Sequence, residues 1–298
     1  DTGGTTQVWL DGKVYATHPA TETIYRPSYV IGCMPMPVNS LTLSADGARI
    51  GYLLDVKEPA DPNVVDRTSP LRRIVVIDGK RSGEYLDATP PVFNADGTQV
   101  AYAAHEKGIG WRIWRNGVPG RSFENIALGF GARVAAKPAP AWMRNDSGFS
   151  ADGRHFCYTG YRKDGWYAVV DEKEYGPYPR IQGLTFAGEG SRPHLFGFAA
   201  ENPDGTMALV VDGKVEQGYA QIIGPVYSAN GAHISFAAKR SKDTAYFIKG
   251  VGDKRFVVDG DIRTPPVLNA DGTHVAYLVY GSKDASSVFF DGARVYSP

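Results

Sequence analysis

The stretch Leu43-Ser44-Ala45-Asp46-Gly47 decides the fold of this chain, because closely similar phrases return four more times. Each copy has Ser or Asn second, alanine third, Asp or Asn fourth and glycine fifth. The other copies are Phe93-Asn94-Ala95-Asp96-Gly97, Phe149-Ser150-Ala151-Asp152-Gly153, Tyr227-Ser228-Ala229-Asn230-Gly231 and Leu268-Asn269-Ala270-Asp271-Gly272. A phrase that returns along a chain predicts an architecture of similar units. Its own residues are therefore expected to be structural.

Each phrase lies between two short stretches that read as β-strands. The stretch after it ends in an aromatic residue, as in Ile50-Gly51-Tyr52 and Val100-Ala101-Tyr102. The stretch before it is often opened by proline, as in Pro91-Val92-Phe93, and a proline at a strand's first residue removes no ladder hydrogen bond. Asp-Gly supplies the turn, since glycine adopts a positive φ at little cost and Asp hydrogen-bonds the backbone two residues on. Each phrase therefore predicts a β-hairpin.

A second hairpin follows, with an aliphatic strand that ends in Asp-Gly or a similar pair. Its copies lie at residues 74–79, 113–117, 208–213 and 288–292, with looser copies at 167–172 and 246–250. The phrase alanines are 50, 56, 78 and 41 residues apart, and the interval of 78 holds two units, with a degenerate copy at 184–186 and 196–198. Six units of four strands, each about 40 residues long, predict an all-β fold of the β-propeller type. A β-sandwich is the structural alternative.

One hairpin is left over at the start of the chain, where Val8-Trp9-Leu10-Asp11-Gly12 reads like another second hairpin. Either residues 7–32 form a seventh blade, with 23–25 and 29–31 as its other strands, or six blades close and this hairpin packs outside them. We favour seven, because closing the ring protects sheet edges. The chain is then a single propeller domain over 1–298. Its four-stranded antiparallel blades lie at about 7–32, 40–89, 90–130, 147–182, 184–222, 225–262 and 266–298.

The composition disfavours several classes of protein. Lys and Arg number 32, as do Asp and Glu, so the formal net charge is 0, whereas a nucleic-acid binder normally carries a basic excess. No run approaches the roughly 18 apolar residues of a membrane helix, so no transmembrane segment is expected. Cys33 and Cys157 are the only cysteines, which excludes a stapled framework and a four-cysteine zinc site. Whether the two pair stays open, as does whether Asp1 is a processed end or a trimmed boundary.

The phrase Ser-Ala-Asp-Gly, followed by a strand ending in Ala-Tyr and by a Val-Val-Asp-Gly-Lys hairpin, resembles the WD40-like PD40 repeats of bacterial β-propellers, the TolB-type family. The resemblance covers residues 40–298 and, more weakly, 7–15. Alanine stands where the family usually has proline, and the separate N-terminal domain of TolB has no counterpart. The resemblance implies an extracytoplasmic bacterial protein, periplasmic or secreted, that binds other molecules. A fold by itself does not assign a function.

Three long insertions mark the face on which we expect binding. The tight Asp-Gly turns should lie on one face of a propeller, and the connections between second and third strands, or between units, on the other. Residues 55–72 read as a second-to-third-strand loop, and 125–146 and 17–40 as connections between units. All three are then on the same face, and long loops on a rigid scaffold commonly carry binding residues. Tolerated drift of surface loops is the alternative.

The candidate binding residues are those on these loops that stand outside the repeat. Trp142 and Arg144 come first, because Trp and Arg are common binding anchors. His105 and Glu106 follow, in a loop between a second and a third strand on the favoured face. The remaining candidates are Arg67, Met34 and Met36.

The remaining titratable residues favour structural roles. His155, His233 and His274 each lie two residues after the turn glycine. This shared position in three units predicts a structural role, such as bonding a neighbouring turn. The sequence contains no His-Glu-x-x-His and no Gly-x-Ser-x-Gly, so no metal ligand, cofactor or catalytic residue is assigned.

These observations favour a non-enzymatic propeller scaffold that binds a protein, peptide or glycan through its long-loop face. A carbohydrate-active propeller enzyme, a lyase or hydrolase with its site at the channel mouth, is one alternative. A structural module of a larger surface assembly is the other. An enzyme should bring several ionisable residues together with perturbed pKa values, whereas a binder should expose apolar or aromatic side chains.

Overall fold

The computed structural model describes residues 4–24, 28–31, 34–37, 40–57, 71–127, 148–187, 196–241, 245–249, 254–281 and 286–297. Every regular element in these ranges is a β-strand, as the repeat predicted. The chain forms two compact units, Asp1–Phe123 and Glu124–Pro298. Within the described ranges, no helix has the length and hydropathy needed to cross a membrane.

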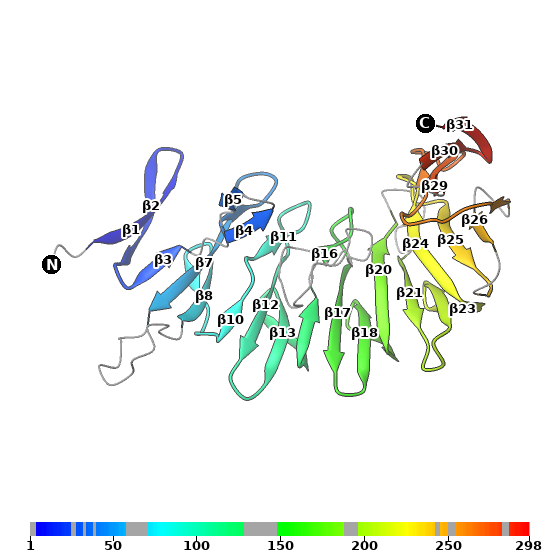
Figure 1. Ribbon diagram of the computed structural model, residues 1–298. Coiled ribbons are helices and arrows are strands. Elements are labelled where there is room, and N and C mark those ends of the chain that lie inside the picture. Colours follow the sequence, from blue (N-terminus) through cyan, green and yellow to red (C-terminus); the bar gives the residue numbers. More distant parts are fainter. Residues whose placement is uncertain are drawn as a thin grey trace. The chain divides into compact units, whose positions relative to one another are not determined.

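The first unit contains two sheets and two separate hairpins (Figure 1). The hairpins are β1 (Thr5–Leu10) with β2 (Lys13–Pro19), and β4 (Ser28–Ile31) with β5 (Met34–Pro37). The first sheet consists of β3 (Glu22–Ile24), β6 (Thr42–Leu43), β7 (Ile50–Lys57), β8 (Leu71–Ile77) and β9 (Lys80–Arg81). The second consists of β10 (Asp87–Ala88), β11 (Val92–Phe93), β12 (Val100–Glu106), β13 (Gly110–Arg115) and β14 (Val118–Phe123).

The second unit contains four more sheets (Figure 1). The third sheet consists of β15 (Asn125–Ala127), β16 (Gly148–Phe149), β17 (Phe156–Arg162), β18 (Gly165–Val170) and β19 (Lys173–Tyr178). The fourth consists of β20 (Arg180–Phe186), β21 (Phe196–Glu201), β22 (Met207–Val211) and β23 (Lys214–Tyr219). The fifth consists of β24 (Gln221–Tyr227), β25 (Ile234–Lys239), β26 (Tyr246–Lys249) and β27 (Arg255–Val258). The sixth consists of β28 (Val267–Leu268), β29 (Val275–Tyr280), β30 (Ser286–Phe290) and β31 (Ala293–Tyr296).

All six sheets are antiparallel and share one strand order, first to fourth in chain order. In the first three sheets the first strand is broken into two pieces that pair with the same second strand: β3 and β6 with β7, β10 and β11 with β12, and β15 and β16 with β17. The two hairpins predicted for each repeat are therefore confirmed. In every sheet the first strand pairs with the second, and the third pairs with the fourth.

The broken first strands correct the predicted placement of two insertions. Ala127 pairs with Thr159 and Gly148 pairs with Cys157, so residues 128–147 interrupt a first strand and do not connect two units. Residues 25–41 interrupt the first strand of the first sheet in the same way, between Ile24 and Thr42. Strand pieces of two or three residues are too short to show a period of two, which is why the sequence did not reveal them.

The pairing of β3 also differs from the strands expected for a seventh blade at 7–32. Ile24 pairs with Leu54 of β7, in the first sheet, and Tyr29 pairs with Met36 of β5. Residues 23–24 and 29–31 therefore do not complete the β1–β2 hairpin, and residue 25 of the predicted strand lies outside the described residues. Among the described residues that hairpin is a sheet of two strands.

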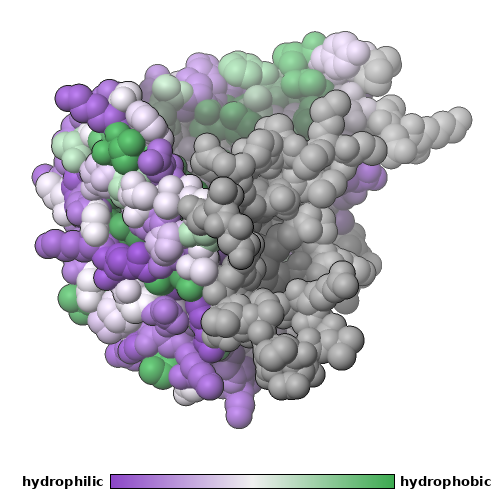
Figure 2. All heavy atoms as spheres, turned by 90° about the vertical axis from the view of Figure 1, so that its left-hand side faces the viewer, coloured by the Kyte–Doolittle hydropathy of each residue, from purple (hydrophilic) through white to green (hydrophobic). Residues whose placement is uncertain are grey.

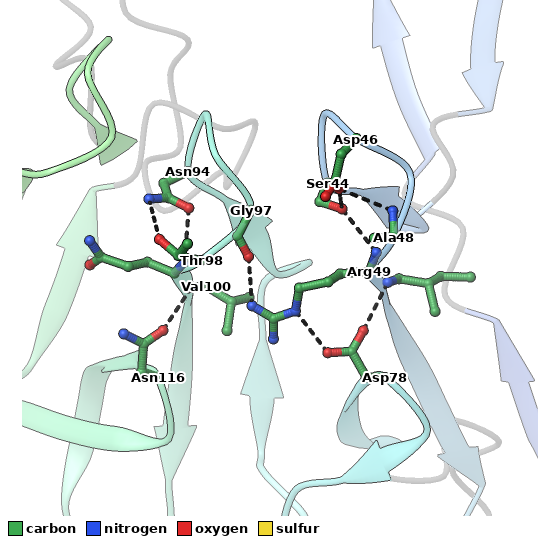
Figure 3. Close-up of polar contacts among 12 residues, drawn as sticks. Ser44, Asp46, Ala48, Arg49, Asp78, Asn94, Gly97, Thr98, Val100 and Asn116 are labelled. Atoms are coloured by element: carbon green, nitrogen blue, oxygen red, sulfur yellow. Dashed lines mark hydrogen bonds and ion pairs between the residues drawn. The ribbon is translucent and has the colours of Figure 1, made fainter.

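Two sets of side-chain hydrogen bonds close the two turns of the first sheet (Figure 3). In the first turn, Asp46 Oδ1 accepts bonds from Ser44 Oγ at 2.5 Å and from the Ala48 N–H at 3.0 Å. These bonds hold the pKa of Asp46 below its usual range. In the second turn, Asp78 Oδ1 accepts the Ile50 N–H at 3.0 Å, and the Asp78 N–H donates to the Ile50 carbonyl at 2.8 Å.

This two-bond clasp ties the turn after the third strand to the first residue of the second strand. It has five copies in the described residues, with φ between 47° and 51° at the turn residue. The pairs are Asp78–Ile50, Asn116–Val100, Asp171–Phe156, Asp212–Phe196 and Asp291–Val275. Asp and Asn tolerate this left-handed conformation better than most residues.

The aromatic residue of each second strand is buried, as the repeat predicted. Exposed fractions do not exceed 6% for Tyr52, Tyr102, Tyr158, Phe236 and Tyr277. Within each unit, apolar clusters join successive sheets. Cys157 is fully buried in one of these clusters with Leu184 and Phe198, in the role of a small apolar side chain.

Candidate functional site

The candidate site lies in the first unit, at the end of the first two sheets where the second strand connects to the third, called here the 2–3 end. In the second sheet this connection is the short turn between Glu106 and Gly110. Gly110 has φ of 100°, and a Cβ there would lie 2.5 Å from the Phe123 carbonyl oxygen. Glycine is therefore required, and the turn presents Ile109 with 49% of its surface exposed.

An aromatic pair stands beside this turn on one face of the second sheet. His105 of β12 lies directly opposite Trp111 of β13. Their rings are stacked, with centroids 5.2 Å apart and planes 8° apart. On its other side His105 pairs with Asp87 of β10. Both rings are half-buried, so the pair forms a partly exposed platform held by backbone pairing on either side.

A clamped carboxylate occupies the opposite face of the same strands. Glu106 accepts bonds from Arg112 Nε at 2.9 Å, from an Arg112 terminal nitrogen at 2.5 Å and from Trp114 Nε1 at 3.2 Å. The hydrogen bonds that Arg112 donates to Glu106 raise the pKa of Arg112, so the guanidinium stays charged. The guanidinium also lies 5.6 Å from the centroid of the Trp114 ring. Glu106 is therefore fixed in an ion pair.

A second ion-paired group lies between the two sheets. Arg73 of β8 donates to Asp55 Oδ1 at 3.2 Å and to the Ala88 carbonyl at 3.2 Å, and it also pairs with Asp87. Burial raises the pKa of Asp55, and the nearby Asp87 adds to this effect while Arg73 opposes it. Two carboxylates thus share one guanidinium.

Two buried tyrosines lie close to these ion pairs. The hydroxyls of Tyr85 and Tyr102 lie 3.1 Å apart, and burial raises the pKa of both phenols. The Tyr102 ring stacks on Trp114, with planes 2° apart. The 2–3 end of the first two sheets is therefore an aromatic and ion-paired layer above an apolar core.

The structure separates some of the predicted site residues. His105 and Glu106 are neighbours in β12, and successive side chains of a strand point to opposite faces, so they belong to different clusters. Met34 and Met36 lie in β5, of which the backbone alone is described. Trp142, Arg144 and Arg67 lie outside the described residues.

The sequence did not single out Trp111 or Arg112 as site residues, although the signal was present. Once the turn at Lys107–Ile109 is recognised, antiparallel register places Trp111 opposite His105. In the described part of the chain, no group of three or more His, Cys, Asp or Glu side chains could hold a metal ion.

No family model matches this chain, and no curated protein sequence matches it. Solved structures similar to it include the β-propeller domain of the Trilobed protease from Pyrococcus furiosus, at 15% identity and a TM-score of 0.36, over 85% of this chain and 83% of that one. TolB from Acinetobacter baumannii is similar at 14% identity and a TM-score of 0.36, over 85% and 77%. The acylaminoacyl peptidase from Pyrococcus horikoshii is similar at 13% identity and a TM-score of 0.35, over 83% of this chain. The chain spans 43% of that peptidase's length.

Proposed function

We propose that the six sheets are blades of a single β-propeller domain, and that this domain is a non-enzymatic scaffold binding a protein or peptide at its 2–3 end. One observation carries the proposal: the stacked His105–Trp111 pair stands beside the exposed Ile109 on a rigid hairpin. Aromatic side chains held in place supply contact area at low entropic cost, and they are frequent binding hot spots.

The ionisable groups at the 2–3 end support binding over catalysis. Asp55, Asp87 and Glu106 each bond to an arginine. A glycosidase, in contrast, needs two carboxylates free to face the sugar. Fixed ion pairs stiffen the scaffold around the aromatic pair. We propose no metal or cofactor.

The other predicted contact residues stay in the proposal as candidates. They are Trp142 and Arg144 in the insertion within the third sheet, Arg67 between β7 and β8, and Met34 and Met36 in β5. The resemblance of the repeat to bacterial TolB-type propellers supports the further proposal of an extracytoplasmic location.

Affinity capture with matched variants tests the proposed binding face. Ile109→Glu combined with Trp111→Ala should lower retention of specific partner proteins by at least about tenfold, as expected for loss of a hot spot. Val118→Glu is the control, because Val118 is 67% exposed at the opposite end of the same sheet. Circular dichroism verifies that both variants are folded.

Equal retention by wild type and both variants would contradict the proposal. Incubation with polysaccharides, followed by an assay for new reducing or unsaturated ends, decides the carbohydrate-enzyme alternative. A large symmetric assembly formed by the purified chain alone would instead favour the structural module.

A further inference from the structure

Three buried aromatic rings meet where the fourth and fifth sheets pack together, in the second unit. They belong to Tyr219 of β23, Phe236 of β25 and Phe247 of β26, and their centroids lie between 5.9 and 6.3 Å apart. None of the three residues is more than 9% exposed, and all belong to one apolar cluster. The rings therefore form a fixed base for the side chains that lie over them.

A cationic side chain lies over each of these rings. The Arg240 guanidinium carbon is 4.3 Å from the centroid of the Tyr219 ring. Lys249 Nζ and the Arg255 guanidinium carbon lie over the two phenylalanines, at 6.0 and 5.1 Å from the ring centroids. Cations are attracted to the faces of aromatic rings. Arg240 and Arg255 are exposed and Lys249 is half-buried, so the rings hold three cations at the surface, called here the cationic cluster.

One carboxylate pairs with the cationic cluster, at its Arg240 end. Glu216 of β23 accepts a bond from Arg240 at 3.3 Å and another from the Tyr219 hydroxyl. Burial and then the bond to Glu216 raise the pKa of the Tyr219 phenol, while the charges of Arg240 and Arg255 oppose the rise. The phenol therefore stays protonated and donates. Glu216 shows how a carboxylate binds here, between a guanidinium and the aromatic base.

The other two cations lie next to each other. Lys249 and Arg255 are directly opposite in the pairing of β26 with β27. Like charges directly opposite each other destabilise a sheet. No carboxylate of the described residues forms an ion pair with either side chain. Three cations and one carboxylate leave an excess of two positive charges in this part of the structure.

This arrangement is particular to the fifth sheet. In the other five sheets, the two residues that flank the turn between the third and fourth strands include at most one cation. The pairs are Ile77–Lys80, Arg115–Val118, Val170–Lys173, Val211–Lys214 and Phe290–Ala293. The fold therefore accepts an apolar residue where Lys249 stands. A local arrangement that costs stability and that the fold does not require is typical of a functional site.

Charge distinguishes the cationic cluster from a mixed protein surface. Figure 2 faces the side of the molecule on which β1 and β2 lie in Figure 1. Its coloured surface is mainly hydrophilic, with apolar residues in small separate groups. A local excess of one charge, in contrast, selects an oppositely charged partner. The net charge of the whole chain is 0, so the excess is local and smaller than the basic surface typical of nucleic-acid binding.

We propose that Lys249 and Arg255 bind the carboxylates of an acidic peptide segment of a partner protein. The segment has two acidic residues separated by one residue, because such side chains lie on the same face of an extended chain. The two cations likewise lie on one face of the fifth sheet, since they are directly opposite. Two carboxylates match the excess of two positive charges, and each pairs with a cation held over an aromatic ring, as Glu216 does.

The peptide Gly-Ser-Glu-Val-Glu-Val-Glu-Ser-Gly, labelled with a fluorophore, is the probe. It should bind the full chain saturably in an anisotropy titration up to about 1 mM peptide at low salt. Salt at about 0.5 M should weaken this binding several-fold, because it screens exposed charges. The peptide with Gln in place of each Glu is the control, and it should bind at least about tenfold more weakly.

Protein variants with matched changes of charge test the two cations. Lys249→Val combined with Arg255→Ser should weaken binding of the acidic peptide by about tenfold or more, since both ion pairs are removed. Lys80→Ser combined with Lys173→Ser is the control, because these lysines begin the fourth strands of the first and third sheets. The control removes the same charge and should leave binding unchanged.

The repulsion between the two cations has its own measurement. Lys249→Val alone should raise the midpoint of urea unfolding, because it removes a like charge opposite Arg255. The same variant should bind the acidic peptide more weakly than wild type. An unchanged or lower midpoint would contradict the uncompensated repulsion on which the proposal rests.

Circular dichroism checks the folding of each variant. Absence of saturable binding overturns the proposal, and so does equal binding of the Glu and Gln peptides, which requires no protein variant. Equal loss of binding in the double variant and its control also overturns it, as does binding of dextran sulfate without binding of the acidic peptide. Ile109→Glu should leave peptide binding unchanged, which separates the cationic cluster from the 2–3 end.

Discussion

The ionisation of Glu22 links pH to stability in the first unit. Its carboxylate is buried and accepts bonds from both terminal nitrogens of Arg81, at 2.8 and 2.6 Å, and His18 Nδ1 lies 3.3 Å away. The bonds from Arg81 are the main cause that lowers the pKa of Glu22 from 4.5. A lowered folded-state pKa means that this stabilisation is present above pH 4.5 and is lost as the pH falls toward the folded value.

Glu22→Gln should therefore lower the free energy of unfolding at pH 7 by about 1–2 kcal/mol, the size of a partly exposed charge-assisted pair. It should also reduce the loss of stability that wild type shows between about pH 5 and pH 3. Urea titrations at several pH values measure both effects. Asp11→Asn, which removes an exposed carboxylate of the same unit, is the control. Identical pH profiles for wild type and Glu22→Gln would contradict the assignment.

Histidines illustrate what a sequence reveals at the scale of single residues. The shared position of His155, His233 and His274 predicted a role in bonding a turn. The structure confirms it for two of them, since His155 pairs with Asp171 and His274 Nδ1 lies 2.5 Å from Asp291 Oδ2. The His233 ring instead lies beside Gly272, in the turn of the next phrase. A repeated position carries this information because each copy has the same surroundings. His105 has no counterpart in the repeat, so its stacking on Trp111 depended on a register that only the fold provides.

At the scale of the element, the clasp predicts which substitutions a turn tolerates. Asn116 at φ of 51° accepts the Val100 N–H at 2.9 Å and donates its own N–H to the Val100 carbonyl at 2.9 Å. Asn116→Ala should lower the free energy of unfolding by about 1–2 kcal/mol, because it removes one acceptor and places alanine in a left-handed conformation. Asn116→Asp should change it by less than about 0.5 kcal/mol, since Asp occupies this position in four other sheets. Urea titrations measure both, and equal destabilisation by the two variants would refute the clasp.

Strand order was predictable from the sequence, whereas the course of the first strands was not. The second strands begin after the phrase and the third strands end at the Asp-Gly or similar pairs, as the sequence indicated, because a turn needs particular residues at fixed positions. The first strand of the third sheet, in contrast, begins with β15, a piece of three residues before a long insertion. Its partner is decided by long-range pairing, which leaves no local pattern in the sequence.

For the whole molecule, the recurring phrase predicted six four-stranded repeats, and six sheets of at least four strands are present in the described residues. The degenerate unit at 184–222 was recoverable because the length of a unit is constrained even where its phrase is lost. Ring closure is a different matter, since it depends on the contact between a first and a last blade, for which the repeat contains no local signal. Closure and the number of blades therefore stay predictions.

The four sheets of the second unit should fold without the rest of the chain, because each packs against the next one along the sequence. In the second unit, one cluster joins the third and fourth sheets through Cys157 and Leu184, a second joins the fourth and fifth through Leu209 and Phe236, and a third joins the fifth and sixth. Stability in such arrays is close to a sum of units and nearest-neighbour interfaces. Residues 124–298 alone should therefore keep β-sheet circular dichroism and unfold cooperatively in urea.

A single sheet provides the matched comparison, because it has no partner for either face. Residues 180–219, which hold the fourth sheet alone, should give the spectrum of an unfolded chain, since repeat units generally need about three copies to bury a core. Cooperative unfolding of 180–219 would show that sheets are stable singly. An unfolded 124–298 would show instead that the second unit depends on the first, and that stability in this chain is not additive between neighbours.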